Sequence, residues 1–271
     1  MQYIEKLAGD KKLMYAWFLA MFTRVDIILV SDIARNDLKS ITEKIKIEIE
    51  KLEAIANRFD DKSEISKVNN TAFHTLYAIS SELSEIIDEC LTYTALTLGY
   101  FDITVNSKNA FTGGSSSVFL DKTTQGIRFL HADVQLDLSG FVKGYVLRNI
   151  RNILIEANIT DALINMGNSS ILAMGNHPHG EGWKVSTINT VSPIENVLHN
   201  QCFTTSGNNE KTIWPILKPQ THETVAPKSA LSVITDDPAI GEVLSKALYV
   251  ASDDERKLIL NNFDEKISWM V

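Results

Sequence analysis

Apolar and polar residues alternate along several short stretches of the chain, and this period of two predicts β-strands. Residues 25–30 begin such a run with Val25, Ile27 and Leu29. The same pattern predicts strands at residues 134–138, 162–168, 170–175, 183–188, 231–235 and 266–271, and one that ends in the hydroxyl-rich turn 203–209. Residues 100–106 are expected to form a short strand or an extended turn.

Apolar residues that recur every three or four positions predict helices instead. The first is expected at residues 41–58, after a capping box made by Ser40 and Glu43. A second spans residues 81–98 and stops at Gly99, which suits a helix C-terminus. Further helices are expected at residues 140–157, at residues 240–251 and in a short segment that begins at Asp253.

These strands both alternate with helices and follow one another directly, which favours an α+β fold with mixed, mainly antiparallel sheets over a doubly wound sheet. The 271 residues are interpreted as one domain, residues 1–271. Polar residues 57–70 lack periodicity and are expected to form a surface loop. The segment from Ser107 to Ser117 contains a Gly-Gly pair and four serines and is expected to be a mobile loop.

The balance of charge limits what the protein binds. The chain has 26 Lys and Arg against 34 Asp and Glu, a net charge of -8, which argues against nucleic acid and anionic membranes as partners. The apolar residues 13–22 are too few for a membrane span, and the start of the chain lacks the order of a signal peptide. A soluble, cytoplasmic protein is expected, or an exported or periplasmic one if a leader has been removed.

The cysteines and one histidine pair offer little chemistry. Cys90 and Cys202 lie among apolar residues and are expected to be buried free thiols; a disulfide between them stays open, although no spacing supports it. His177 and His179 are interpreted as an exposed hairpin tip, because a metal site there would need a third ligand nearby.

The segment from Asp137 to Tyr145 is the strongest candidate for binding chemistry. A predicted strand runs through Ser139 and Gly140 into a predicted helix that carries Lys143 in its first turn. Amides at a helix N-terminus attract anions, whereas a lysine is unfavourable there unless an anion is bound. The segment therefore predicts an anion site, with an ordinary turn and a solvated lysine as the alternative.

Several motifs occur in an order that resembles the FAD:protein FMN transferases, the ApbE-like proteins also described as thiamine-biosynthesis lipoprotein-like. The resemblance extends from Met21 to the C-terminus. Its motifs are Met21-Phe22-Thr23, Ser63-Glu64-Ile65-Ser66-Lys67-Val68-Asn69, Gly99-Tyr100-Phe101-Asp102-Ile103-Thr104-Val105, the segment from Asp137 to Tyr145, Asn165-Met166-Gly167-Asn168, a strand led by Trp183, and Thr205-Ser206-Gly207.

The resemblance implies an ApbE-like fold and an enzyme that binds FAD with magnesium, transfers FMN to a threonine of an acceptor protein and releases AMP. It implies no catalytic residue by itself, and none is assigned. The positions that it implies for binding the flavin nucleotide are Met21, Tyr100, Asp102, Asp137, Ser139, Gly140, Lys143, Asn165, Gly167, Thr205, Ser206 and Gly207.

The resemblance also implies a Mg²⁺ site, formed by the backbone carbonyl of Val142 and two side chains of a C-terminal helix. Glu242 stands where the family has Asp, and Lys246 stands where it has Thr. Magnesium requires oxygen ligands in octahedral geometry, and an ammonium group both lacks a lone pair and repels the ion. Either Glu242 keeps a metal, or Lys246 pairs with Glu242 and occupies the metal's place.

Two further departures bear on activity. Residues 215–222 read Pro-Ile-Leu-Lys-Pro-Gln-Thr-His where the family has His-Ile-Ile-Asp-Pro-Arg-Thr-Gly, and Ser139 replaces the first Gly of a Gly pair. Three hypotheses follow: a flavin transferase with an altered metal site, a catalytically silent relative that binds a flavin nucleotide or a partner protein, and an unrelated α+β protein whose turns mimic the motifs.

Overall fold

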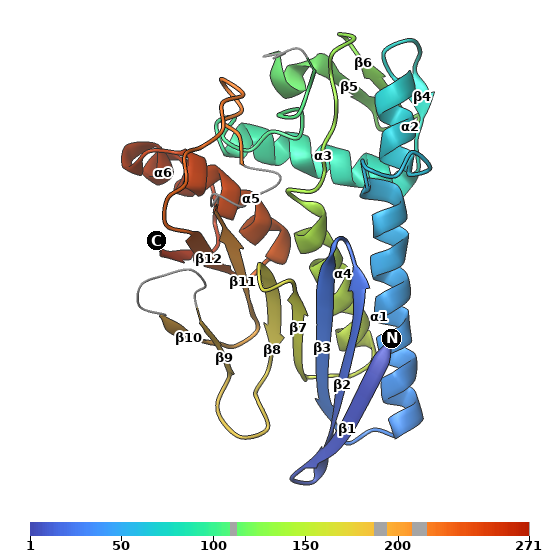
Figure 1. Cartoon of the computed structure of the whole chain (residues 1–271), viewed down its shortest axis with the longest axis vertical. Coiled ribbons are helices and arrows are strands. Elements are labelled where there is room, and N and C mark those ends of the chain that lie inside the picture. Colours follow the sequence, from blue (N-terminus) through green and yellow to red (C-terminus); the bar gives the residue numbers. More distant parts are fainter. Residues whose placement is uncertain (109–112, 187–193, 208–215, 271) are drawn as a thin grey trace.

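A computed structural model describes residues 1–108, 113–186, 194–207 and 216–270. Its largest feature is an eight-stranded sheet in the order β1-β2-β3-β7-β8-β11-β12-β13, with every neighbouring pair antiparallel (Figure 1). The strands are β1 (Gln2–Ala8), β2 (Lys11–Ala20), β3 (Thr23–Ser31), β7 (Asp161–Met166), β8 (Ser170–Met174), β11 (Gln201–Ser206), β12 (Leu231–Thr235) and β13 (Ser268–Met270). This arrangement confirms the predicted α+β class.

Three helices cover one face of this sheet: α1 (Arg35–Ala56), α4 (Val142–Glu156) and α5 (Pro238–Val250) (Figure 1). Each is amphipathic and turns its apolar stripe toward the sheet or a neighbouring helix. In α1 the buried stripe consists of Leu38, Ile41, Ile45, Ile49 and Leu52. Burial of these side chains joins the helices and the sheet in one apolar core.

The helices α4 and α5 approach each other unusually closely at Gly144. A Cβ atom added at Gly144 would lie 2.3 Å from the backbone oxygen of Pro238 and 2.7 Å from the Cα of Ala239. Real Cβ atoms do not come this near to backbone, so only glycine permits the contact. Gly144 therefore fixes the separation of the two helices immediately beside Lys143.

A small second core covers part of the opposite face. The hairpin of β9 (Trp183–Ser186) and β10 (Glu195–Leu198) packs Trp183 and Leu198 against Ile171 and Phe203 of the large sheet. Neighbouring residues of β8 point to opposite faces, so that Leu172 belongs to the larger core while Ile171 belongs to this one.

The remaining elements lie at one end of the large sheet (Figure 1). They are α2 (Glu64–Thr71), α3 (Ser81–Leu96), α6 (Asp253–Leu260) and a three-stranded sheet of β4 (Tyr77–Ala78), β6 (Gly126–Phe129) and β5 (Val118–Asp121). Of these, α3 and α6 agree with the prediction, whereas the small sheet was not predicted. Across the described ranges, no helix combines the length and the apolar character that a membrane span requires.

One N-terminal prediction needs correction, and one element was not predicted. The apolar residues 13–22, for which no secondary structure was predicted, lie mostly in the strand β2, which pairs with β1 and β3. Helix α1 begins at Arg35, after Ala34 as N-cap, so Ser40 and Glu43 lie inside the helix and form no start signal. The buried Leu38 extends the apolar stripe by one turn, and its packing outweighs the local capping pattern.

Three predicted local structures also differ from the observed ones. The expected loop at residues 57–70 contains α2, which Ser63 caps by accepting a hydrogen bond from the Ser66 amide. Residues 100–106 form turns and bends, and residues 134–138 belong to no helix or strand. The expected loop from Ser107 to Ser117 contains a short 3-10 helix at Gly114–Ser117, while residues 109–112 lie outside the described part.

The two cysteines are buried and free, as predicted. Burial raises the pKa of the Cys90 thiol well above its ordinary value and that of Cys202 to about 12, so both thiols stay protonated at neutral pH. His177 is exposed and packs edge-on against Trp183, with ring centroids 5.2 Å apart.

Candidate functional site

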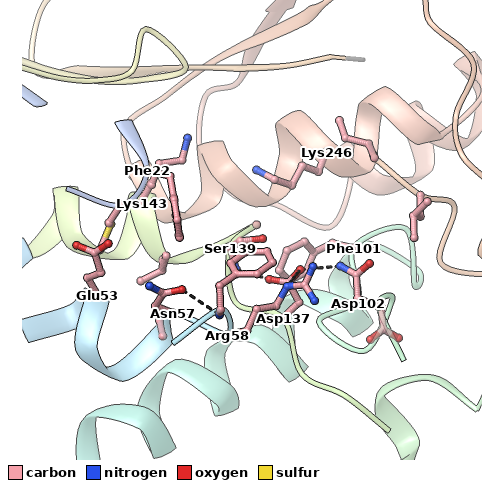
Figure 2. Close-up of a pocket in the computed structure, with 18 of the residues that line it drawn as sticks. Phe22, Glu53, Asn57, Arg58, Phe101, Asp102, Asp137, Ser139, Lys143 and Lys246 are labelled. Atoms are coloured by element: carbon pink, nitrogen blue, oxygen red, sulfur yellow. Dashed lines mark hydrogen bonds and ion pairs between the residues drawn. The ribbon is translucent and has the colours of Figure 1, made fainter. Parts of the chain in front are cut away.

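A cavity of about 390 Å³ opens where the N-terminus of α4, the C-terminal end of α1, the β2–β3 turn and α5 meet (Figure 2). Pockets of this size accept part or all of a small-molecule ligand. Its lining residues are Met21, Phe22, Glu53, Ala56, Asn57, Arg58, Phe59, Tyr100, Phe101, Asp102, Asn106, Asp137, Ser139, Gly140, Val142, Lys143, Ile216, Leu217, Lys246 and Val250. The cavity thus has both aromatic walls and charged groups.

The β2–β3 turn brings two apolar side chains to this cavity. Met21 and Phe22 adopt the left-handed conformation, with φ of 48° and 58°, which suits a tight hairpin but strains residues other than glycine. The ring of Phe22 meets that of Phe59 edge-on at 5.6 Å. The turn thereby places both side chains in the lining of the cavity.

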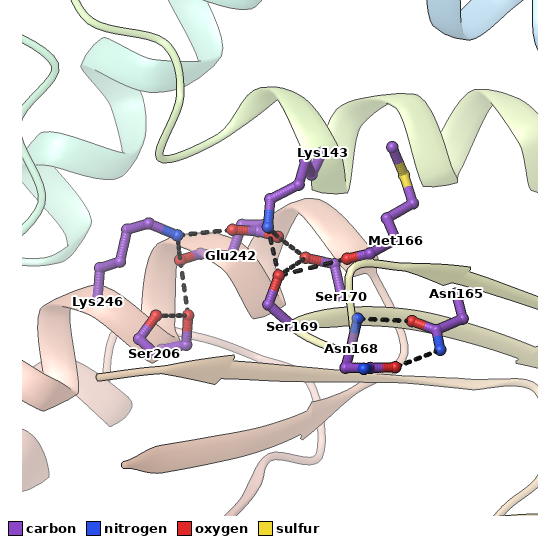
Figure 3. Close-up of polar contacts among 10 residues, drawn as sticks. Lys143, Asn165, Met166, Asn168, Ser169, Ser170, Ser206, Glu242 and Lys246 are labelled. Atoms are coloured by element: carbon purple, nitrogen blue, oxygen red, sulfur yellow. Dashed lines mark hydrogen bonds and ion pairs between the residues drawn. The ribbon is translucent and has the colours of Figure 1, made fainter. Parts of the chain in front are cut away.

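The predicted Asn165-Met166-Gly167-Asn168 motif packs against this hairpin at Thr23 and Arg24. Gly167 has a φ of 67°, and a Cβ there would lie 2.0 Å from the Thr23 hydroxyl oxygen. Its amide donates to the carbonyl of Arg24 at 2.9 Å. Asn165 accepts a 2.8 Å hydrogen bond from the amide of Asn168, which closes the β7–β8 turn (Figure 3).

Asp137 holds together the segments on one side of the cavity. Its carboxylate accepts hydrogen bonds from the side chain of Asn106 at 2.6 Å and from the amide of Ser139 at 2.9 Å. The Nε atom of Arg58 lies 3.0 Å from its Oδ2 atom. We call Arg58, Asn106, Asp137 and Ser139 the Asp137 cluster. The buried carboxylate of Asp137 has partners for both of its oxygens, and its bond to the Ser139 amide shapes the turn at Gly140.

Asp102 has a similar structural role. Its carboxylate accepts hydrogen bonds from the amide and the hydroxyl of Thr104, both at 2.7 Å, and from the amide of Ser115 at 3.1 Å. These bonds tie the turn after α3 to the short helix at Gly114–Ser117. The neighbouring Tyr100 hydrogen-bonds to Glu255, and burial followed by this bond raises the pKa of Tyr100 to about 12.

The other side of the cavity carries two lysines that share one carboxylate. Lys246 Nζ lies 2.6 Å from Oε2 of Glu242, one turn earlier on α5, and Lys143 Nζ on α4 lies 3.9 Å from Oε1 (Figure 3). Ser170 donates to Oε1 as well, and Lys143 donates to the Ser169 hydroxyl at 2.5 Å. We call Lys143, Ser170, Glu242 and Lys246 the Glu242 cluster.

Burial and charge in this cluster act on its pKa values in opposite directions. Burial alone would raise the pKa of the Glu242 carboxyl, but the ammonium groups of Lys246 and Lys143 and two hydrogen bonds hold it below its ordinary value. Burial lowers the pKa of the Lys143 ammonium, which Glu242 opposes and Lys246 reinforces. Glu242 is therefore ionised and serves as the counter-charge for both lysines.

The amides at the start of α4 are largely engaged within the turn. Those of Phe141 and Val142 donate to the carbonyl of Leu138, and that of Gly144 donates to the carbonyl of Phe141. An anion at the predicted site would therefore meet the lysine side chains rather than these three amides. Lys143 also differs from the solvated alternative, because its side chain is only 21% exposed and is hydrogen-bonded.

The structure brings together part of the predicted flavin-nucleotide set. Met21, Tyr100, Asp102, Asp137, Ser139, Gly140 and Lys143 line the cavity, whereas the described residues Asn165, Gly167, Thr205, Ser206 and Gly207 do not. Ser206 instead contacts α5, because its hydroxyl lies 2.8 Å from the hydroxyl of Ser245. The Ser245 hydroxyl in turn donates to the backbone carbonyl of Glu242. Their binding role remains a prediction.

Several lining residues escaped sequence reasoning, among them Arg58, Phe59 and Asn106. Arg58 and Phe59 come from the segment 57–70, which was expected to be a surface loop, and Asn106 comes from the segment 100–106, which was expected to be a short strand or an extended turn. A signal was nevertheless present in the motif that begins at Ser63: a family motif in an apparently featureless loop indicates that the surrounding residues face the site.

The donor groups present do not suit a magnesium ion at Glu242. One of its oxygens is held by the Lys246 ammonium and the other accepts from Ser170. Within the described ranges, no three His, Cys, Asp or Glu residues cluster in a way that could hold a metal. Magnesium needs several oxygen ligands with free lone pairs, and Lys246 supplies none.

The sequence and the fold correspond to a known class of protein. The sequence model of the ApbE family matches residues 21–271, and the chain belongs to that family. The family resemblance predicted from the motifs is thereby confirmed. The match begins at the β2–β3 turn, so β1 and β2 precede it.

Individual proteins agree with this assignment. The chain is 25% identical over 264 residues to a FAD:protein FMN transferase of Chlamydia muridarum, covering 86% of this chain and 82% of that one. It is 27% identical over 234 residues to one of Chlamydia trachomatis, covering 74% and 73%. The flavin transferase ApbE of Vibrio cholerae has a similar fold, with a TM-score of 0.82 at 15% identity over 95% of this chain and 93% of that one. The ApbE protein of Thermotoga maritima gives a TM-score of 0.80 at 21% identity over 98% and 93%.

Proposed function

We propose that this protein binds FAD in the cavity and transfers its FMN half to a threonine hydroxyl of an acceptor protein. The observation that carries the proposal is the pair of ammonium groups, Lys143 and Lys246, at one side of a cavity with aromatic walls. A dinucleotide joined by a diphosphate offers flat rings for such walls and negative charge for such lysines. The names of the chlamydial relatives support the same reaction.

In this reaction the threonine oxygen attacks the phosphorus atom of the FMN half. A new P–O bond forms to the acceptor, the P–O bond to the AMP half breaks, the hydroxyl proton is released and AMP leaves with the bridging oxygen. Charge grows on the phosphate oxygens during this step, and fixed positive groups stabilise it. Lys143 and Lys246 would supply this charge, while Asp137 and Asp102 hold the turns that shape the cavity.

The test has a binding stage and a transfer stage. FAD added to the purified protein is expected to bind with quenching of flavin fluorescence, and AMP is expected to appear when a threonine-bearing acceptor protein is added. Mass spectrometry should show the acceptor heavier by one FMN moiety, and its threonine-to-alanine variant should stay unmodified. Failure to bind FAD would overturn the proposal. Binding without AMP release or acceptor modification would instead favour the silent relative.

Lys143→Met provides a test within the chain. Loss of one charge-assisted contact to phosphate is expected to weaken FAD binding about tenfold, which corresponds to about 1.4 kcal/mol. Lys44→Met is the matched control, because Lys44 is an exposed residue of α1 remote from the cavity lining. Equal FAD affinity in the two variants would contradict the assigned role of Lys143.

A further inference from the structure

Lys246 is fixed in the site by both charge and packing. Its ammonium lies 2.6 Å from the Glu242 carboxylate and 3.4 Å from the Glu242 backbone oxygen. Its aliphatic part packs over the turn at Gly140, where an added Cβ would lie 3.2 Å from its Cδ. Lys246 thus occupies the space between α5 and the start of α4.

The charge of the Glu242 cluster is not balanced internally. Glu242 is only 1% exposed and carries one negative charge, whereas Lys143 and Lys246 carry two positive charges and stay 21% and 25% exposed. The other charged residues that line the cavity are Glu53, Arg58, Asp102 and Asp137, of which Asp137 is paired with Arg58 and Asp102 is engaged by Thr104 and Ser115. The Glu242 cluster itself carries one more positive than negative charge, and this local excess at the two lysines suits a diphosphate.

We infer that the Lys246 ammonium takes the part of a divalent cation in this chain, so that the diphosphate of its flavin nucleotide is bound without a metal ion. This inference rests on the proposed function and concerns how the same site works. A divalent ion beside Lys143 and a carboxylate would leave two positive charges at the site. With Lys246 in its place the site carries one, enough to attract the diphosphate but with weaker stabilisation of the charge that grows in transfer.

The decisive experiment compares FAD binding by the purified protein in a chelator with FAD binding during titration with Mg²⁺, both followed by flavin fluorescence. The dissociation constant is expected to change by less than about twofold. Calorimetric titration of the protein with MgCl₂ alone is expected to give no saturable heat. Lys246→Met should weaken FAD binding about tenfold in both conditions, because one charge-assisted contact is lost. Lys44→Met, in the exposed part of α1, should leave it unchanged.

Restoring oxygen donors should restore a response to metal. The double variant Glu242→Asp/Lys246→Thr presents a shorter carboxylate and a hydroxyl in place of the ammonium. Its FAD affinity is expected to be low in chelator and to rise about tenfold or more with Mg²⁺. Circular dichroism melting establishes that each variant is folded, and the wild-type titration decides the inference even if a variant is not.

The possible outcomes distinguish failure of the inference from failure of the proposed function. Absence of FAD binding in every condition overturns the proposed function and the inference together. FAD binding that requires Mg²⁺ in the wild type, or saturable Mg²⁺ binding by the protein alone, overturns the inference and leaves the proposed function standing. Unchanged FAD affinity in folded Lys246→Met also overturns the inference.

Discussion

The cavity is flanked by two clusters built around a buried carboxylate, and they use it differently. In the Asp137 cluster the carboxylate forms an ion pair with one cation, Arg58, and accepts hydrogen bonds from Asn106 and Ser139. In the Glu242 cluster one carboxylate serves two ammonium groups from two helices. The first cluster is neutral and holds turns in place, whereas the second carries one more cation than anion, which the proposed function assigns to the diphosphate. Burial alone therefore does not show whether a carboxylate holds turns in place or balances nearby ammonium groups; its hydrogen-bond and ion-pair partners show it.

The largest expected effect comes from removing the shared counter-charge. Glu242→Gln leaves Lys143 and Lys246 close together without a carboxylate, and should lower the free energy of unfolding by about 3 kcal/mol, measured by urea denaturation. Adding Lys246→Met to this variant removes one of the two ammonium groups and should recover part of the loss. If the single and the double variant unfold alike, the two lysines do not depend on Glu242 as described.

A change next to the same cluster tests packing without altering its charges. Gly144→Ala places a Cβ 2.3 Å from the Pro238 backbone oxygen, so that α4 and α5 must move apart. Overpacking of this kind should cost about 2 kcal/mol in urea denaturation. Gly180→Ala is the control, because nothing lies within 4 Å of a Cβ there and its stability should be nearly unchanged.

The Asp137 cluster should respond less strongly. Asp137→Asn keeps the shape of the side chain but removes its charge and turns a donor toward Arg58 or Asn106, and it should cost about 1.5 kcal/mol of unfolding free energy. A double-mutant cycle with Arg58→Met measures the coupling between the two side chains. A loss larger than that of Glu242→Gln would reverse the proposed difference between the clusters.

The smallest effect is expected at a carboxylate on the surface. The Ser252 hydroxyl, Tyr100 and the Ser252 amide lower the pKa of Glu255 from 4.5 to about 2. Since the folded-state pKa is depressed, the stabilising contribution is complete above pH 4.5 and is lost as the pH falls toward 2. Glu255→Gln should therefore cost less than about 1 kcal/mol at pH 7, and the difference from wild type should vanish near pH 2. A pH-independent difference would contradict this interpretation.

Strands with one polar and one apolar face could be predicted from the sequence, as β3 illustrates. The strand β2 could not, because its outward residues Tyr15 and Trp17 are as apolar in character as the buried Met14 and Ala16, which hides the alternation. The helix α2 was not predicted, because Ile65 and Val68 are the only apolar residues on its buried face. Both elements depend on tertiary packing more than on local pattern.

In the candidate site, too, some contacts could be predicted from local sequence and others depend on the tertiary arrangement. The contact between Lys246 and Glu242 was one of two predicted outcomes, because residues four apart meet on one helix face. The contribution of Lys143 to the same carboxylate required the approach of α4 to α5, about one hundred residues apart in sequence. Arg58 and Phe22 likewise reach the cavity only through the arrangement of the hairpin and the end of α1.

The contact of Gly144 with Pro238 has an evolutionary consequence. The backbone of α4 at Gly144 contacts the backbone of α5 at Pro238, and this contact sets the distance between the two helices. The side chains of the Glu242 cluster are therefore not needed to set that distance. Residues 242 and 246 can then be exchanged while the framework around them stays the same. If the inference about Lys246 holds, two substitutions on one helix are enough to change how this site balances the charge of its ligand.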